Sequence, residues 1–462
     1  MNERSFLIKV GGPAVEQGQI PFMLLSQILR GVQETIYILA SAAVEYDFRQ
    51  RARIPKELQQ ACELRRVFER QGSYELVAAV AAPQAAGGIE DIGLLCKERY
   101  LDILDCLTTG SHPQEMQACL RDILADFGLG AGTRVGCVGW KCYDARLTGD
   151  SRHASDLPSY LVDLLRELAG EARLVRNATS LFTDPATGLR VVGLEPEQIA
   201  AFEYASIQTS TSTLAVMREL REGVREDELE RLLVAMGLPL SCHRMISFGE
   251  KARRGLASPG PNRAALGDVF TIGYGVAGAL SSRAGFIARG PADVPAACCD
   301  FYPKFAGNYF DVVATWYESL RLGVTLGHVF SAVESVRDDA LYKLAVNPGH
   351  TLHLDEWVHS PFAAGSTVPL VSGMALQMDI IPISKGPFCY VNAEDGVVLA
   401  DESLRGDIAQ KFPACWERME ARRDFMINTL GIRLDESVLP LSNIPGWLPP
   451  YAMSLDQVFV RR

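Results

Sequence analysis

Residues 267–288 read GDVFTIGYGVAGALSSRAGFIA, a stretch dominated by apolar, β-branched and aromatic residues. This composition predicts two strands, at 268–276 and 280–288. Further strands are expected at 243–248, 375–383 and 396–399. Apolar periodicity predicts helices around the strands, at 196–222, 294–322, 326–345 and 404–430. Residues 191–462 are therefore expected to form one α+β domain, with the apolar tail 439–450 packed against the body or against a partner subunit.

The first 190 residues predict two smaller units. Residues 1–110 are expected to form an α+β module with its own core, from strands at 6–10, 62–68 and 74–80 and helices at 21–39 and 89–107. Residues 113–190 alternate between the two element types, with helices at 116–127 and 157–168 around a strand at 135–140. That alternation favours a small α/β domain with parallel strands.

Composition and charge exclude several classes of protein. The 462 residues are 48% hydrophobic and 22% charged, which excludes a disordered or fibrous chain. A net charge of −11 argues against general nucleic-acid binding, which needs clustered Lys and Arg. The apolar segment 22–46 is interrupted by polar residues, so no membrane span is expected. The N-terminus lacks a secretion signal and the eleven cysteines form no CxxC pair, so we expect a cytoplasmic protein.

Three of the seven histidines fall within residues 349–359, which read GHTLHLDEWVH. Three imidazoles and two carboxylates in so short a stretch are typical of metal-ligand chemistry. If the segment is extended, His353, Asp355 and His359 share one face and His350 points the other way. The alternative is a hydrogen-bonded strand without catalytic function. A second candidate, a Cys242–His243 nucleophile pair, is disfavoured because neighbours on a strand face opposite sides.

Four short motifs in this order carry a family resemblance: GDVFTI at 267–272, GH at 349–350, SGM at 372–374 and EDGV at 394–397. Their order and spacing resemble the creatinase, aminopeptidase P and prolidase group, over about residues 113–435. The resemblance implies a pita-bread fold, a curved antiparallel sheet covered by helices, at 191–462. It also implies that 113–190 is a remnant of that family's N-terminal domain, whereas residues 1–110 do not match it.

The resemblance implies a site as well. The family's dinuclear centre uses two Asp, two Glu and one His, and the matching residues here are His350, Asp379 and Glu394. The first Asp is expected where Gly273 or Tyr274 stands, and the second near Ser282 or Arg283, so both are missing. A further family histidine is replaced by Ala257-Ser258, with His243 as the nearby substitute, and His359 matches the second histidine after the Gly-His pair.

Charge then limits the metal content. Two divalent ions carry four positive charges, and only two of the family's four carboxylates remain, so two ions would leave costly uncompensated charge. We expect no metal or one divalent ion (Mn, Zn or Co) on His350, Asp379 and Glu394. Creatinase, within the same group, hydrolyses a C–N bond without a metal by means of a histidine and carboxylates.

These residues predict a hydrolase that cleaves an amide-like or other C–N bond in a small polar molecule or short peptide. His350, His359 and His243 are expected to handle protons, and His353, Asp355 and Arg283 to bind substrate. The alternative is a catalytically inactive pita-bread protein that uses the old cleft for recognition. A homodimer is expected, with neither a nucleic-acid nor a membrane partner.

Overall fold

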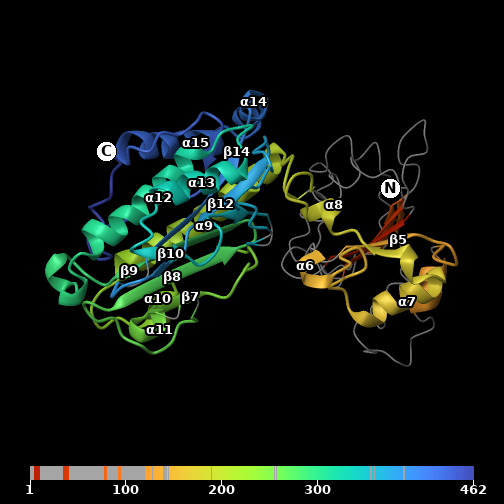
Figure 1. The fold of residues 1–462 in the computed structure, drawn as a ribbon, viewed down its shortest axis with the longest axis horizontal. Coiled ribbons are helices and arrows are strands. Elements are labelled where there is room, and N and C mark those ends of the chain that lie inside the picture. Colours follow the sequence, from red (N-terminus) through yellow and green to blue (C-terminus); the bar gives the residue numbers. More distant parts are fainter. Residues whose placement is uncertain are drawn as a thin grey trace. The chain divides into compact units, whose positions relative to one another are not determined.

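The computed structural model divides the chain into two compact units, Met1–Leu189 and Arg190–Arg462 (Figure 1). The structure describes residues 5–10, 35–40, 77–80, 92–94, 120–126, 128–138, 143, 145–188, 190–253, 255, 257–353, 356–357, 359–388 and 391–461. Within these residues, no helix is long and apolar enough to cross a membrane.

The first unit is built on a six-stranded sheet. Its strand order is β4 (Ile92–Leu94), β3 (Val77–Val80), β2 (Thr35–Ala40), β1 (Ser5–Val10), β5 (Val135–Val138) and β6 (Val175–Asn177). The four strands β2, β1, β5 and β6 pair in parallel with one another, as predicted for an α/β arrangement, whereas β3 pairs antiparallel with β2 and β4. Helix α7 (Ser159–Ala169) buries Leu161, Val162 and Leu165 in the same apolar cluster as Val135 of β5. Helix α5 (Leu120–Asp126) adds Leu124 to that cluster.

This sheet corrects the expected boundary at residue 110. Strand β1 pairs with β2 on one side and with β5 on the other, so residues from 1–110 and from 113–190 share one sheet. The helices expected at 21–39 and 89–107 are also wrong where β2 and β4 lie. The run Thr35–Ala40 is rich in β-branched residues, and a short apolar run of this kind pairs as a strand wherever a neighbour is available.

The second unit is built on a seven-stranded antiparallel sheet. Its order is β11 (His350–Thr351), β12 (Met374–Asp379), β14 (Asn392–Leu399), β9 (Ala279–Phe286), β8 (Val269–Val276) and β7 (Met245–Phe248), with β15 (Val438–Pro440) also paired to β14. A separate two-stranded ribbon joins β10 (Tyr342–Leu344) to β13 (Pro382–Ser384). The two strands predicted from residues 267–288 are the adjacent strands β8 and β9.

Long helices cover one face of this sheet (Figure 1). Helix α9 (Pro196–Glu219) packs on β8 and β9, where Thr209 lies 3.1 Å from Ser281, oxygen to oxygen. From helix α12 (Gly307–Ser319), the Tyr309 hydroxyl accepts a hydrogen bond from the Ala393 N–H of β14. Because successive strand residues face opposite sides, Ser282 and Glu394 lie on the other face. The sheet thus has one helix-covered face and one face that carries the candidate site.

The remaining helices differ from their predicted lengths. Helix α13 (Leu326–Val336) ends before β10, and the helix expected at 404–430 is split into α14 (Glu402–Lys411) and α15 (Pro413–Asp424). Proline at 413 explains the break, because it cannot continue a helix from the preceding turn. Short helices α10 (Glu226–Glu230) and α11 (Gly249–Arg253) flank β7 in the sequence. The tail packs against the body, with Trp447 and Leu448 buried.

Candidate metal centre

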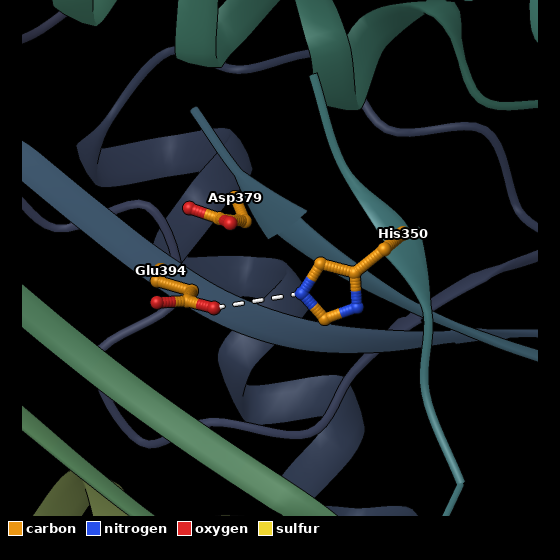
Figure 2. A group of neighbouring side chains, drawn as sticks. All are labelled: His350, Asp379 and Glu394. Atoms are coloured by element: carbon orange, nitrogen blue, oxygen red, sulfur yellow. Dashed lines mark ion pairs between the residues drawn. The ribbon is translucent and has the colours of Figure 1, made fainter. Parts of the chain in front are cut away.

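Three neighbouring strands bring a histidine and two carboxylates together (Figure 2). Asp379, the last residue of β12, lies directly opposite Glu394 on β14, and His350 lies opposite Gln377 on β12. Opposed residues, and residues two apart on one strand, share a face of the sheet. One potential ligand atom from each of His350, Asp379 and Glu394 lies within 4.8 Å of the others. The structure therefore brings together the three ligands that the sequence predicted.

A glycine fixes where the chain enters β11. Gly349 has a φ of +103°, and a Cβ there would lie 2.9 Å from the Gln377 carbonyl oxygen and 3.0 Å from Trp316 Nε1. Trp316 Nε1 donates a hydrogen bond of 2.8 Å to the Pro348 carbonyl. Only glycine combines this backbone conformation with so close an approach. The Gly-His pair thus places His350 at the start of the strand.

The two nitrogens of His350 have different surroundings. Nδ1 lies 3.2 Å from the Thr351 carbonyl oxygen, whereas Nε2 lies 3.0 Å from Glu356 Oε1 and 3.6 Å from Glu394 Oε1. A carbonyl only accepts hydrogen bonds, so Nδ1 carries a hydrogen and Nε2 faces the carboxylates. Burial alone would lower the pKa of His350, but the nearby carboxylates of Glu356 and Glu394 raise it to about 10. Without a cation, the imidazole therefore holds a proton between the acids.

Burial disfavours the ionised forms of both carboxylates. Burial raises the pKa of Asp379 to about 6, although the nearby His350 partly offsets the rise. Burial, and then the charge of Asp379, raises the pKa of Glu394 well above its usual range. The Asp379 side chain is 9% exposed, and its Oδ1 has no hydrogen-bond partner among the described residues. A buried oxygen without a partner, beside an imidazole and a second carboxylate, fits a divalent cation.

The row of opposed residues continues across the sheet. It includes the two positions at which the resemblance leads us to expect aspartates. Glu394 faces Ser282 on β9, Ser282 faces Gly273 on β8, and Gly273 faces Met245 on β7. Of the expected alternatives, Gly273 and Ser282 are thus the positions on the site face. A Cβ at Gly273 would lie 2.8 Å from Met245 Cε, so a methionine tip fills this space. This part of the site offers a hydroxyl and a thioether in place of two carboxylates.

Arg283 does not belong to the site, contrary to its predicted role in substrate binding. It is buried on the helix-covered face, where Nη2 donates to Asp395 Oδ2 at 2.9 Å. Arg283 Nε and Nη2 also donate to the carbonyl oxygens of Trp447 and Ile444. Ser282 and Arg283 are consecutive strand residues and must face opposite sides, so only one of them can reach the site. Arg283 instead ties β9 and β14 to the C-terminal tail.

Two other predicted histidines lie near β11 with separate contacts. His353 is buried, packs edge-on against Phe202, and has Nδ1 3.4 Å from Arg190 Nε. Burial and the charge of Arg190 hold the pKa of His353 well below its usual range, so its ring is neutral. His359 is half-buried, and its backbone carbonyl accepts the Thr351 N–H at 2.7 Å. Neither histidine is one of the three clustered ligands.

Of the last two predicted site residues, His243 is not one of the three clustered ligands and Asp355 lies outside the described residues. His243 is exposed, at the end of the loop that leads into β7.

The structure places two residues near the site that sequence reasoning did not assign to it, Glu356 and the disfavoured nucleophile Cys242. The Oε1 atom of Glu356 faces His350. The sequence does not distinguish Glu356 from a solvent-exposed acid, because it belongs to none of the family motifs. Cys242 lies close enough to Glu356 and Glu394 for their charges to act on it. Burial first, and then these two acids, raise the pKa of the Cys242 thiol to about 12. A thiol held so firmly protonated is a poor nucleophile.

The fold and this row of residues define the architectural class: the second unit has the pita-bread fold, as predicted. The chain is similar to the structures of an aminopeptidase from Pseudomonas aeruginosa (16% identity, TM-score 0.52, 89% of this chain and 100% of that chain) and of Xaa-Pro dipeptidase from Bacillus anthracis (13%, 0.52, 84% and 96%). It is also similar to prolidase from Pyrococcus furiosus (15%, 0.51, 82% and 96%). No protein-family model and no curated protein sequence matches the chain. At these identities the shared property is the fold.

Proposed function

We propose that the protein is a hydrolase of an amide-like or other C–N bond in a small polar molecule or short peptide, with one divalent ion at its centre. The observation that carries the proposal is the convergence of His350, Asp379 and Glu394 within 4.8 Å. The similar structures are peptidases that act on such bonds, as their names state. Manganese, zinc and cobalt all accept this combination of imidazole and carboxylate donors.

Charge balance supports one ion in place of two. Asp379 and Glu394 together carry two negative charges when ionised, which one divalent ion neutralises. The positions of two further carboxylates are Gly273 and Ser282, which bring no charge. A second ion would add two uncompensated charges beside the first, at a cost of several kcal/mol in a buried site.

The roles of the side chains follow from their donor atoms. His350 Nε2 and the carboxylates of Asp379 and Glu394 would hold the ion. When bound, a divalent ion acts as a Lewis acid and polarises a substrate carbonyl. His359 and His243 remain the proposed proton carriers, since neither is one of the three clustered ligands and an imidazole can both accept and donate a proton. His353 is proposed as a neutral substrate contact, together with Asp355.

Metal analysis with an activity screen tests this proposal. Purified protein should contain one Mn, Zn or Co per chain after dialysis, and it should hydrolyse a member of a panel of dipeptides, Xaa-Pro dipeptides, N-acyl amino acids and guanidino compounds. Glu394→Gln should lose the metal and the activity. The matched control, Glu417→Gln at an exposed position of α15, should keep both. Two ions per chain, or full activity in Glu394→Gln, would contradict the proposal.

A recognition protein without catalysis is the second candidate. The observation that favours it is the Met245 side chain, which fills space that a carboxylate would need above Gly273. Such a protein would bind panel compounds, seen as a shift in melting temperature, but would release them unchanged. A homodimer is proposed for either function, and light scattering after size exclusion would measure it.

A further inference from the structure

The loop that leaves β11 carries a third carboxylate into the centre. Thr351 and His359 hold the loop closed at its base, because the Thr351 N–H donates to the His359 carbonyl at 2.7 Å and the His359 N–H donates to Thr351 Oγ1 at 3.1 Å. Glu356 lies between these two residues, and its side chain is only 22% exposed. Its Oε1 lies 3.0 Å from His350 Nε2, which is closer than Glu394 Oε1 at 3.6 Å.

From this arrangement we infer that Glu356 is a fourth protein ligand of the ion and replaces one of the carboxylates lost from β8 and β9. The inference rests on the proposed one-ion function and adds a residue to it. Glu356 matches no position of the family motif quoted above. The loop supplies a carboxylate next to β11, at one edge of the sheet. Strands β8 and β9 supply none at Gly273 and Ser282.

The nitrogen that Glu356 faces supports this role. His350 Nδ1 is directed to the Thr351 carbonyl, so Nε2 is the nitrogen with a lone pair for an ion. Two donors at about 2.1 Å from one ion lie roughly 3.0 Å apart at a right angle and roughly 3.4 Å apart at the tetrahedral angle. The separations of 3.0 Å and 3.6 Å from Nε2 to Glu356 and Glu394 match these values closely.

A second observation points to a ligand between these groups. Asp379 Oδ1 is buried and has no hydrogen-bond partner among the described residues, and Asp379 belongs to the same cluster of ligand atoms. A buried carboxylate oxygen normally accepts a hydrogen bond or contacts a cation. His350, Asp379 and Glu394 thus each offer a donor within 4.8 Å of the others, and Glu356 approaches the same His350 Nε2 from the loop.

The number of donors also explains why one ion could persist after two aspartates were lost. His350, Asp379 and Glu394 alone give three donors, and the row beyond them offers only the Ser282 hydroxyl and the Met245 thioether. Mn²⁺ and Zn²⁺ sites usually have at least one more protein or solvent oxygen. With Glu356 the set becomes three carboxylates and one imidazole.

Metal binding to the full-length protein tests the inference. Metal-free wild type and four variants are titrated with Mn²⁺ while the signal of free Mn²⁺ is followed by electron paramagnetic resonance. The variants are Glu356→Gln, Glu356→Asp, Glu394→Gln and the exposed control Glu417→Gln. Co²⁺ is then added to each protein, because its visible spectrum reports the ligands themselves. Thermal unfolding of the metal-free proteins checks that each variant is folded.

We expect wild type and Glu417→Gln to bind one Mn²⁺ with the same affinity. Glu356→Gln should weaken binding at least tenfold and change the Co²⁺ spectrum, Glu356→Asp should weaken it less, and Glu394→Gln should abolish it. If Glu356→Gln does not fold, Glu356→Asp decides by the same two measurements.

Two contrary results are distinguishable. If Glu394→Gln loses the ion but Glu356→Gln keeps wild-type affinity and spectrum, Glu356 is no ligand while the one-ion function stands. If wild type binds neither Mn²⁺ nor Co²⁺, both the one-ion function and the role of Glu356 are wrong.

Discussion

Met245 on β7 covers Gly273 on β8, so that a Cβ at Gly273 would lie only 2.8 Å from the Met245 methyl group. Gly273 is one of the two positions where the resemblance places an aspartate. An aspartate at this position and the Met245 side chain opposite it would therefore compete for the same space. Restoring the acid requires the methionine to move.

The first prediction is that Gly273→Asp destabilises the protein by about 1–3 kcal/mol, because it overpacks this position and buries a further carboxylate. The same substitution should cost less in a Met245→Ala background, where the space is free. Urea unfolding of the two single variants and the double variant measures the coupling between the sites. Additive effects would mean that the two side chains do not compete for space.

The second prediction concerns metal content. The triple variant Gly273→Asp, Met245→Ala, Ser282→Asp returns two carboxylates to the row that ends at Glu394 and Asp379. With Glu356, Asp379 and Glu394 it has five carboxylates, enough to balance two divalent ions, so the metal content measured by elemental analysis should rise from one to two ions per chain. An unchanged single ion in the triple variant would show that charge does not set the stoichiometry.

The third prediction follows from the buried pair Arg283–Asp395. Arg283→Met leaves the Asp395 carboxylate without its cation, with only Ser442 and Gly446 as donors, so stability should fall by about 3–5 kcal/mol. Arg433→Met, at an arginine whose side chain is 88% exposed, should change stability little. Urea unfolding compares the two variants. A metal affinity unchanged in Arg283→Met would agree with its position on the helix-covered face.

Periodicity and motif order were sufficient to predict much of the second unit. Strands β8 and β9 and helix α9 follow from apolar patterns, and the convergence of His350, Asp379 and Glu394 is what the family resemblance implies. Alternation along a strand also shows that Ser282 and Arg283 cannot both face the site. It does not show which of them does, because that depends on pairing with β14.

The features that escaped prediction depend on contacts between distant residues. Glu356 sits in a loop, where no period or spacing separates a ligand from a solvated acid. The fit of Met245 over Gly273 depends on the register of β7 against β8. Thr35–Ala40 was predicted as helix because its apolar residues fit a helical stripe, whereas its pairing with β1 makes it a strand. In each case a partner far along the chain decides the outcome.

The fourth prediction concerns the stability of the metal-free protein. Burial raises the pKa of Asp379 from 3.8 to about 6, so its ionised form destabilises the folded state at pH values above 6. Asp379→Asn should therefore stabilise the chelator-treated protein at pH 8 by about 1–3 kcal/mol, and the difference should vanish below about pH 4. Asp407→Asn, on the exposed side of α14, serves as the control. If Asp379→Asn instead lowers stability at pH 8, burial of the ionised Asp379 side chain does not destabilise the fold.

The last prediction is that metal binding releases protons and strengthens with pH. The pKa of His350 is about 10 in the metal-free protein, so at pH 7 an ion must displace the proton on Nε2. Affinity should then rise about tenfold per pH unit from pH 6.5 towards 10. The stability of the metal-free protein depends on pH in the opposite sense. The charged imidazole stabilises the fold fully below the unfolded-state pKa of histidine, about 6.5, and this contribution is lost as the pH rises through 10.

Below pH 6 a further proton must leave, because Asp379 is then protonated as well. Calorimetric titration with Mn²⁺ in buffers of different ionisation enthalpy counts the protons, and we expect at least one at pH 8 and one more at pH 5. Glu356→Gln removes a carboxylate that raises the pKa of His350, so its affinity should level off at a lower pH than that of wild type. The opposite outcome would be a binding enthalpy that is the same in all buffers, together with an affinity that does not change between pH 6.5 and 9. It would show that Nε2 carries no proton for the ion to displace.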